Sequence, residues 1–80
     1  MNLDEIAFLR ALGDRLRTQR VARGLTQAEL ADRCGLHRTF IGSVERGERN
    51  VSILNLRLLA RVLRVSLTEL FTDPPNAKGS

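Results

Sequence analysis

The side chains best equipped for chemistry in this sequence are its arginines. Twelve of the thirteen basic residues are Arg, Lys78 is the exception, and the formal net charge is +4. The guanidinium group is a planar fork of hydrogen-bond donors that matches phosphates and the O6 and N7 acceptors of guanine. An arginine-rich, basic chain therefore favours nucleic acid as a partner, although a solvated basic surface fits the same composition.

Residue types that carry out catalysis are scarce. Cys34 is the only cysteine and His37 the only histidine, too few ligands for a zinc site. The sequence has no glycine-rich phosphate loop and no Gly-x-Ser-x-Gly nucleophile motif. We therefore expect that the protein is not an enzyme and that it binds no cofactor, metal or small-molecule ligand. A lone cysteine and the lack of any apolar run near the roughly 20 residues that span a bilayer favour a cytoplasmic protein with no membrane partner.

Five helices are expected to position the basic side chains. Polar caps at Asn2, Thr26, Ser52 and Ser66, and glycine stops at positions 24, 35 and 47, predict helices over residues 3–23, 27–34, 37–46, 53–63 and 67–71. Gly13 interrupts the first helix at a cost of about 1 kcal/mol relative to Ala, which a packed helix tolerates. With 80 residues, 42% of them hydrophobic, the chain is expected to form one all-α domain over residues 1–73. A flexible polar tail follows over residues 74–80.

Residues 27–46 have the pattern that a helix-turn-helix requires. Ala31 is small where two crossing helices approach, and Gly35 lies where the chain must reverse within a few residues. The side chains that can point into one core are Leu30, Cys34, Leu36, Ile41 and Val44. Two helices held in this way leave the outer face of the second helix free to enter a major groove of DNA.

This stretch resembles the helix-turn-helix of the phage-repressor and Cro family of transcriptional regulators. The matching positions are Gln27, Ala31, Gly35, Leu36, Ile41 and Val44, flanked by Gly24-Leu25-Thr26 and Glu45-Arg46-Gly47, and the resemblance extends from about Leu12 to Phe71. A more specific resemblance, to the controller proteins of restriction–modification systems, rests on His37-Arg-Thr-Phe-Ile41 and Val44-Glu-Arg-Gly-Glu-Arg-Asn-Val-Ser52. It implies a regulator that binds a pseudo-palindromic operator in double-stranded DNA as a homodimer, with RNA polymerase as a further candidate partner.

Base contacts are expected from the recognition helix, the second helix of the motif. Arg38 and Thr39 lie in its first turn, the end that meets base edges, and Ser43 follows one turn later. Arg38 can bind guanine O6 and N7, and Thr39 offers a hydroxyl or a methyl group. Phe40 stands where controller proteins often carry Tyr, so it keeps an apolar contact with a thymine methyl or a base step but lacks the hydroxyl.

Phosphate contacts are expected from the residues that flank these positions: Gln27, His37, Arg46, Arg49 and Asn50. The resemblance places Gln27, which opens the first helix of the motif, at a backbone phosphate beside free backbone N–H groups. It also implies a buried ion pair between Arg20 and Glu45, which links the first helix of the chain to the end of the recognition helix.

A second copy of the chain is the expected partner of the C-terminal helices. The core uses only part of their apolar surface, which leaves Val51, Ile53, Leu54, Leu58 and Leu67, with Leu70 and Phe71 shared between core and surface. Such a patch is buried most simply in a two-fold dimer. Phe8 is available either to this dimer surface or to the last helix.

Some alternatives stay open at this level. An antitoxin or a phage-type repressor would also bind DNA, whereas a protein-interaction module would use the apolar C-terminal surface and leave the helix-turn-helix silent. Arg57, Arg61 and Arg64 form a stripe that is either a solvated face or a second DNA surface. Arg64 also stands where similar sequences place Gly, so a left-handed backbone there would cost about 1 kcal/mol.

Overall fold

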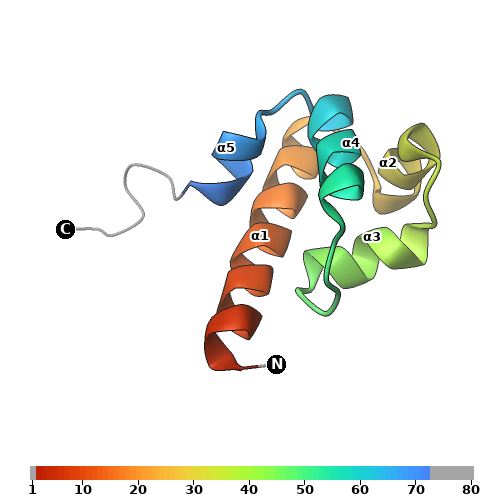
Figure 1. The fold of residues 1–80 in the computed structure, drawn as a ribbon. Helices are drawn as coiled ribbons and strands as arrows, with labels where there is room; N and C mark the ends of the chain where they lie inside the picture. The colour runs from red at the N-terminus through yellow and green to blue at the C-terminus, as the bar shows by residue number, and fades with distance from the viewer. Residues whose placement is uncertain (1, 73–80) are drawn as a thin grey trace.

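The computed structural model describes residues 2–72, and these residues form five helices (Figure 1). The helices are α1 (Leu3–Ala22), α2 (Gln27–Cys34), α3 (Arg38–Glu45), α4 (Ile53–Leu63) and α5 (Leu67–Phe71). The described residues contain no strand, and the all-α prediction is confirmed. The expected domain end at residue 73 and the tail over residues 74–80 lie outside the described part. No helix within residues 2–72 is long and apolar enough to cross a membrane.

Side-chain caps fix the start of four helices. Three of them begin with capping boxes, formed by Asn2 with Glu5, Thr26 with Glu29, and Ser66 with Glu69. The fourth is α4, where Ser52 accepts a hydrogen bond from the backbone N–H of Asn55 at 3.1 Å. By contrast, α3 begins one residue later than predicted, because His37 is its N-cap in an extended conformation and makes no side-chain cap hydrogen bond. The start of α3 is therefore free of side-chain caps.

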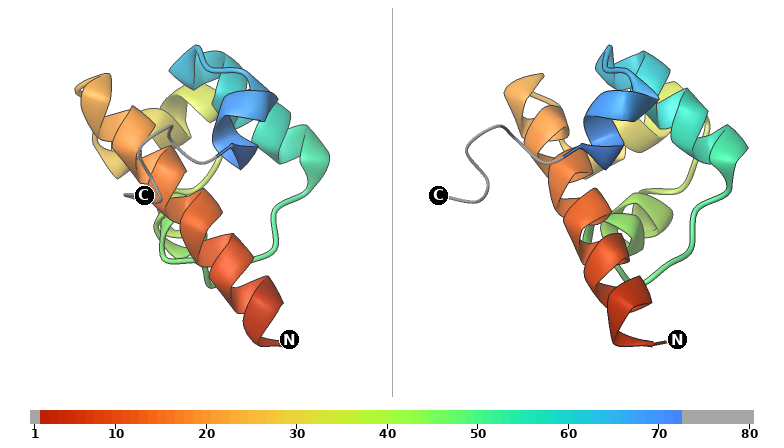
Figure 2. Two further views of the ribbon diagram at one scale, coloured as in Figure 1. Left: turned by 90° about the vertical axis from the view of Figure 1, so that its left-hand side faces the viewer. Right: turned by 60° about the vertical axis from the view of Figure 1, so that its left-hand side comes forward.

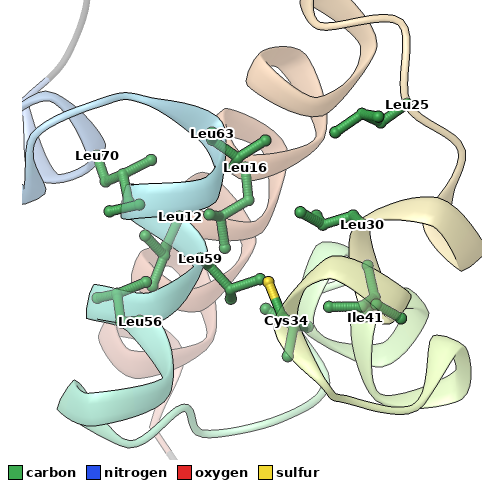
Figure 3. Packing of buried hydrophobic residues seen from close by; sticks show 13 residues of the cluster. Leu12, Leu16, Leu25, Leu30, Cys34, Ile41, Leu56, Leu59, Leu63 and Leu70 are labelled. Atoms are coloured by element: carbon green, nitrogen blue, oxygen red, sulfur yellow. The ribbon is translucent and has the colours of Figure 1, made fainter.

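One apolar core joins all five helices (Figure 3). In this core α2 packs against α3 and α4, α1 packs against α3, and α5 packs against both α1 and α4. The side chains that Figure 3 labels in this core are Leu12, Leu16, Leu25, Leu30, Cys34, Ile41, Leu56, Leu59, Leu63 and Leu70. Fully burying one such aliphatic side chain stabilises the fold by about 1.5–3 kcal/mol, so this leucine-rich interior fixes the relative orientation of α2 and α3.

The backbones of α1 and α3 approach each other closely at Gly13. A Cβ atom at this position would overlap the carbonyl oxygens of Val44 and Glu45 at the end of α3. The prediction that this glycine is merely tolerated was therefore incomplete, because its lack of a side chain is what lets the two helices meet.

Arg64 ends α4 in the left-handed region, with φ 60° and ψ 43°. It is the only residue other than glycine with a positive φ among the described residues. The left-handed backbone considered in the sequence analysis is therefore present at Arg64, and it costs the fold about 1 kcal/mol relative to glycine at this position. The guanidinium of Arg23 donates to the carbonyl oxygen of Arg64 at 3.4 Å, a contact that uses only the backbone of Arg64.

Candidate nucleic-acid interface

The helix-turn-helix arises because α2 and α3 bury complementary faces on either side of a tight turn. Gly35 ends α2 in the left-handed conformation, and the N–H of Leu36 donates back to the carbonyl oxygen of Ala31 at 2.9 Å. On the buried side of α3 lie Ile41 and Val44. α2 packs against the buried side of α3 (Figure 1), and the opposite side of α3 faces solvent.

The first turn of α3 presents Arg38 and Thr39 to solvent. Both side chains are exposed, and neither forms a hydrogen bond or ion pair with another residue between 2 and 72. They line an open groove of about 510 Å³. The other residues along this groove are Arg20, Thr26, Gln27, Ala28, Gly42 and Arg46. The groove therefore combines two exposed guanidinium groups with hydroxyl and amide groups, which suits an anionic, hydrogen-bonding ligand.

Behind this groove, Arg20 and Glu45 form a buried bidentate ion pair. Nε of Arg20 donates to one carboxylate oxygen of Glu45 at 2.6 Å, and Nη2 donates to the other at 3.0 Å. Nη1 of Arg20 also donates to the carbonyl oxygen of Leu25 at 2.7 Å. The hydrogen bond to Glu45 raises the pKa of the Arg20 guanidinium, so this group keeps its positive charge.

Gln27 belongs to the same network. Its side-chain amide donates to Glu45 Oε1 at 3.0 Å, so one N–H is already used within the protein. The network as a whole ties α1, the loop before α2, α2 itself and the end of α3 together. It thereby fixes the position of α3 relative to α1 and α2.

Three of the predicted contact residues touch one another. The hydroxyl of Ser43 donates to the carbonyl oxygen of Phe40 at 2.9 Å and accepts from Nε of Arg49 at 3.3 Å. The guanidinium carbon of Arg49 lies 5.4 Å from the centre of the Phe40 ring, a cation–π contact. Sequence reasoning missed this cluster, because Arg49 lies beyond the end of α3 and no helical spacing relates it to Phe40.

The remaining predicted phosphate contacts are exposed but lie in different places. His37 is exposed at the N-cap of α3, beside Arg38. Arg46 lines the groove and also pairs with Glu48 at 3.1 Å, with both side chains about 60% exposed. Asn50 lies apart from these residues, in a second groove along the start of α1.

The predicted dimer residues form what we call the C-terminal patch, with one exception. Ile53, Leu54 and Phe71 are 60%, 72% and 43% exposed, respectively. Val51, Leu58 and Leu67 are half-buried against the core and complete the patch. Leu70 was wrongly assigned to this surface: its side chain is 1% exposed, because α5 packs it into the core between α1 and α4.

Cys34 and the arginine stripe of residues 57, 61 and 64 do not line either groove. Cys34 is buried in the core, and burial raises the pKa of its thiol, which disfavours the reactive thiolate. No group of three His, Cys, Asp or Glu side chains among residues 2–72 is arranged to hold a metal ion. Arg57, Arg61 and Arg64 are exposed to solvent.

Comparisons with known proteins find helix-turn-helix proteins, among them controllers of restriction–modification systems. The family model described as helix-turn-helix matches residues 16–70. Control protein C.SmaI from Serratia marcescens is 48% identical over 61 residues, which are 76% of this chain and 73% of that protein. The crystal structure of the restriction–modification controller protein C.AhdI from Aeromonas hydrophila superposes with a TM-score of 0.79 at 49% identity, covering 81% of this chain and 98% of that one.

A further solved structure contains DNA. The restriction–modification controller protein C.Esp1396I, crystallised as a tetramer with its natural 35 base-pair operator, superposes with a TM-score of 0.72 at 34% identity. The match covers 80% of this chain and 84% of that one.

Proposed function

The chain belongs to the helix-turn-helix family, and on this premise we propose that it is a transcriptional regulator of the restriction–modification controller type. It binds a pseudo-palindromic operator in double-stranded DNA as a homodimer. The observation that carries the proposal is the exposed first turn of α3, where Arg38 and Thr39 lie on an open cationic groove and have no hydrogen-bond or ion-pair partner among residues 2–72. A helix end of this kind is what reads bases in a major groove.

Base readout is assigned to the outer face of α3. Arg38 donates two hydrogen bonds to guanine O6 and N7, and Thr39 contacts a neighbouring base through its hydroxyl or methyl group. Phe40 supplies an apolar contact to a thymine methyl or a base step. Ser43 joins them through its remaining hydrogen-bonding capacity, since its own proton is donated to the Phe40 carbonyl.

Phosphate binding sets the register of the protein on DNA. The exposed guanidinium of Arg46, the N-terminus of α2 at Gln27, and His37 lie around the same groove as Arg38 and are assigned to one stretch of backbone. Arg49 and Asn50 reach phosphates on the far side of α3. The guanidinium of Arg49 lies over the Phe40 ring, and this weak cation–π contact opposes a movement toward phosphate only modestly.

This function needs no catalytic residue and no cofactor, and we propose neither for this chain. Binding to the operator places the protein in the cytoplasm with the DNA, where RNA polymerase is the candidate partner for activation or repression. The C-terminal patch is the proposed dimer interface, because a two-fold dimer sets two recognition helices about 34 Å apart, one turn of DNA.

The decisive experiment selects duplexes from a random-sequence pool with the purified protein and measures affinity for the winners over a range of salt concentrations. We expect a two-fold symmetric site. Arg46 and Arg49 from two protomers would neutralise four phosphates, so the logarithm of affinity should fall with the logarithm of salt concentration with a slope of about −4. A folded protein that enriches no sequence, or binds DNA without salt dependence, would favour the protein-interaction module instead.

A further inference from the structure

The N-terminal half of α1 carries an aromatic side chain that the core does not use. Phe8 stacks on Phe71 of α5, with ring centroids 5.9 Å apart and ring planes inclined by 18°. Despite this contact the two side chains remain 50% and 43% exposed. Phe8 precedes the residues matched by the helix-turn-helix family model, which begin at position 16. The stack therefore leaves two large apolar side chains half in water, outside the matched domain.

This aromatic pair continues the C-terminal patch onto α1. On one side of the molecule α5 lies between α1 and the first half of α4 (Figure 2), in agreement with its packing against both helices. Phe71 belongs both to the C-terminal patch and to the stack. Exposed apolar side chains thus stand on all three of these helices, Leu54 on α4, Phe71 on α5 and Phe8 on α1, and the last two are in contact.

A groove borders the same surface. It has a volume of about 530 Å³ and lies between the start of α1 and the loop that leads to α4. Phe8 and Leu9 line it together with Asp4, Glu5 and Asn50. A side chain from a molecule seated on Phe8 can enter this groove beside the ring.

The C-terminal patch by itself is small for a stable interface. It consists of six apolar side chains, and three of them are already half-buried against the core of their own chain. A stable protein–protein interface buries about 800 Å² on each partner, with 20–30 residues a side. The extra surface must come from an adjoining element, and α1 is the element that offers an exposed aromatic side chain next to the patch.

We propose that Phe8 is an anchor of the dimer interface, and that each protomer packs the Phe8–Phe71 stack against the other. This inference rests on the homodimer of the proposed function and adds the N-terminal half of α1 to it. The occupant is a second copy of the chain, because Phe71 belongs both to the stack and to the C-terminal patch that is assigned to that copy.

Sedimentation equilibrium of the full chain tests the proposal. Phe8→Ala should raise the dimer dissociation constant at least tenfold, because each dimer loses two aromatic anchors. Leu3→Ala is the matched control. Leu3 is 83% exposed at the same end of α1, and a separation of five residues turns it by about 140° away from Phe8. It should leave the dissociation constant unchanged.

A second measurement does not depend on truncating the stack. The chain contains no Trp or Tyr, so Phe8→Trp introduces a single fluorophore. Its emission should shift to shorter wavelength as the protein concentration is raised through the dissociation constant, whereas Leu3→Trp should show no shift. Circular dichroism of every variant verifies that the helices are retained.

The outcomes separate this inference from the proposed function. A wild-type chain that stays monomeric at all concentrations would refute the homodimer itself. A wild-type dimer weakened by Leu54→Ala but unaffected by Phe8→Ala, with no shift for Phe8→Trp, would overturn only the extension onto α1. A Phe8→Ala protein that dimerises normally but loses transcription with RNA polymerase would likewise overturn it and assign the face to the polymerase.

Discussion

Arg38 and Glu45 occupy the two ends of α3 and illustrate two different uses of charge. Arg38 is exposed and has no ion-pair or hydrogen-bond partner between residues 2 and 72, so its donors are free for a ligand. Glu45 is buried, and its carboxylate accepts hydrogen bonds from both Arg20 and Gln27. Removing one partner of such a pair leaves a buried charge uncompensated, whereas removing Arg38 leaves nothing unsatisfied inside the fold.

From this contrast we predict that Arg38→Ala lowers operator affinity without lowering stability. The loss should be about 1–3 kcal/mol for each half-site, with relaxed preference at one base pair of that half-site. Binding measured against single-base variants of the operator checks the prediction, and unchanged thermal unfolding shows that the fold is intact.

Arg57→Ala is the control for this prediction, because Arg57 is an exposed arginine on α4 rather than α3. It should leave base preference unchanged. Equal weakening by Arg38→Ala on every DNA sequence would show that Arg38 contacts phosphate and not a base.

Three contacts of single residues could not be predicted from local sequence patterns. The ion pair of Arg20 and Glu45 followed from the resemblance, since its partners stand 25 positions apart and no local pattern relates them. The need for glycine at position 13 depends on the approach of a distant helix end, and that approach is set only by tertiary packing. The contact of Arg49 with Phe40 depends on the path of a loop, which helical periodicity does not describe.

At the scale of elements, the helices were predictable because residues close in sequence determine where each helix begins and ends. A capping box spans four residues and a serine cap acts within the same distance, so four of the five helix starts agree with the sequence. The exception is α3, whose first residue carries no capping signal and was placed one position early. Boundaries without a cap are the least defined in sequence because propensity alone changes gradually along the chain.

The end of α4 supplies a stability prediction. Arg64→Gly should stabilise the protein by about 1 kcal/mol, because glycine adopts φ near +60° without a steric penalty. For a domain of this size that gain corresponds to a rise in Tm of about 4–8 °C. Thermal unfolding at a fixed protein concentration measures it.

The matched variant for Arg64→Gly is Arg61→Gly, one turn earlier on the same exposed helix. It should lower stability by about 1 kcal/mol, because glycine in a helix interior is unfavourable. If both variants destabilise the protein equally, the left-handed backbone at Arg64 carries no strain.

The capping boxes of α2 and α5 predict how stability responds to acid. Hydrogen bonds from Thr26 and Ser66 lower the pKa values of Glu29 and Glu69. A folded-state pKa below the unfolded value adds stability that is present above the unfolded pKa, about 4.3, and is lost as the pH falls through the folded one. Glu29→Gln should therefore make stability less sensitive to acid.

Urea unfolding at pH 7 and at pH 3 compares these variants. The drop in unfolding free energy between the two pH values should be smaller for Glu29→Gln than for the wild type. It should be smaller still for the double variant that also carries Glu69→Gln. An unchanged drop in both would show that the caps do not contribute to acid sensitivity.

At the scale of the whole molecule, the sequence predicted which apolar residues the C-terminal helices have beyond those needed for the core. It did not predict which of these residues are buried and which are exposed. Leu70 and Phe71 are neighbours on a helix of only five residues, yet one is fully buried and the other is exposed. Which side of α5 faces inward is decided by its packing on α1 and α4 together. The same packing brings Phe8 and Phe71 together from positions 63 residues apart, a contact that no short-range pattern contains.

The network of Arg20, Gln27 and Glu45 has an evolutionary consequence. It fixes α3 to α1 and α2, whereas Arg38 and Thr39 on the exposed front of α3 take no part in any internal hydrogen bond among the described residues. Substitutions at the front can therefore accumulate without loss of the fold, and the preferred operator can drift from one lineage to the next. Two descendants of one ancestral regulator could then coexist in a cell, each controlling its own promoter without interfering with the other.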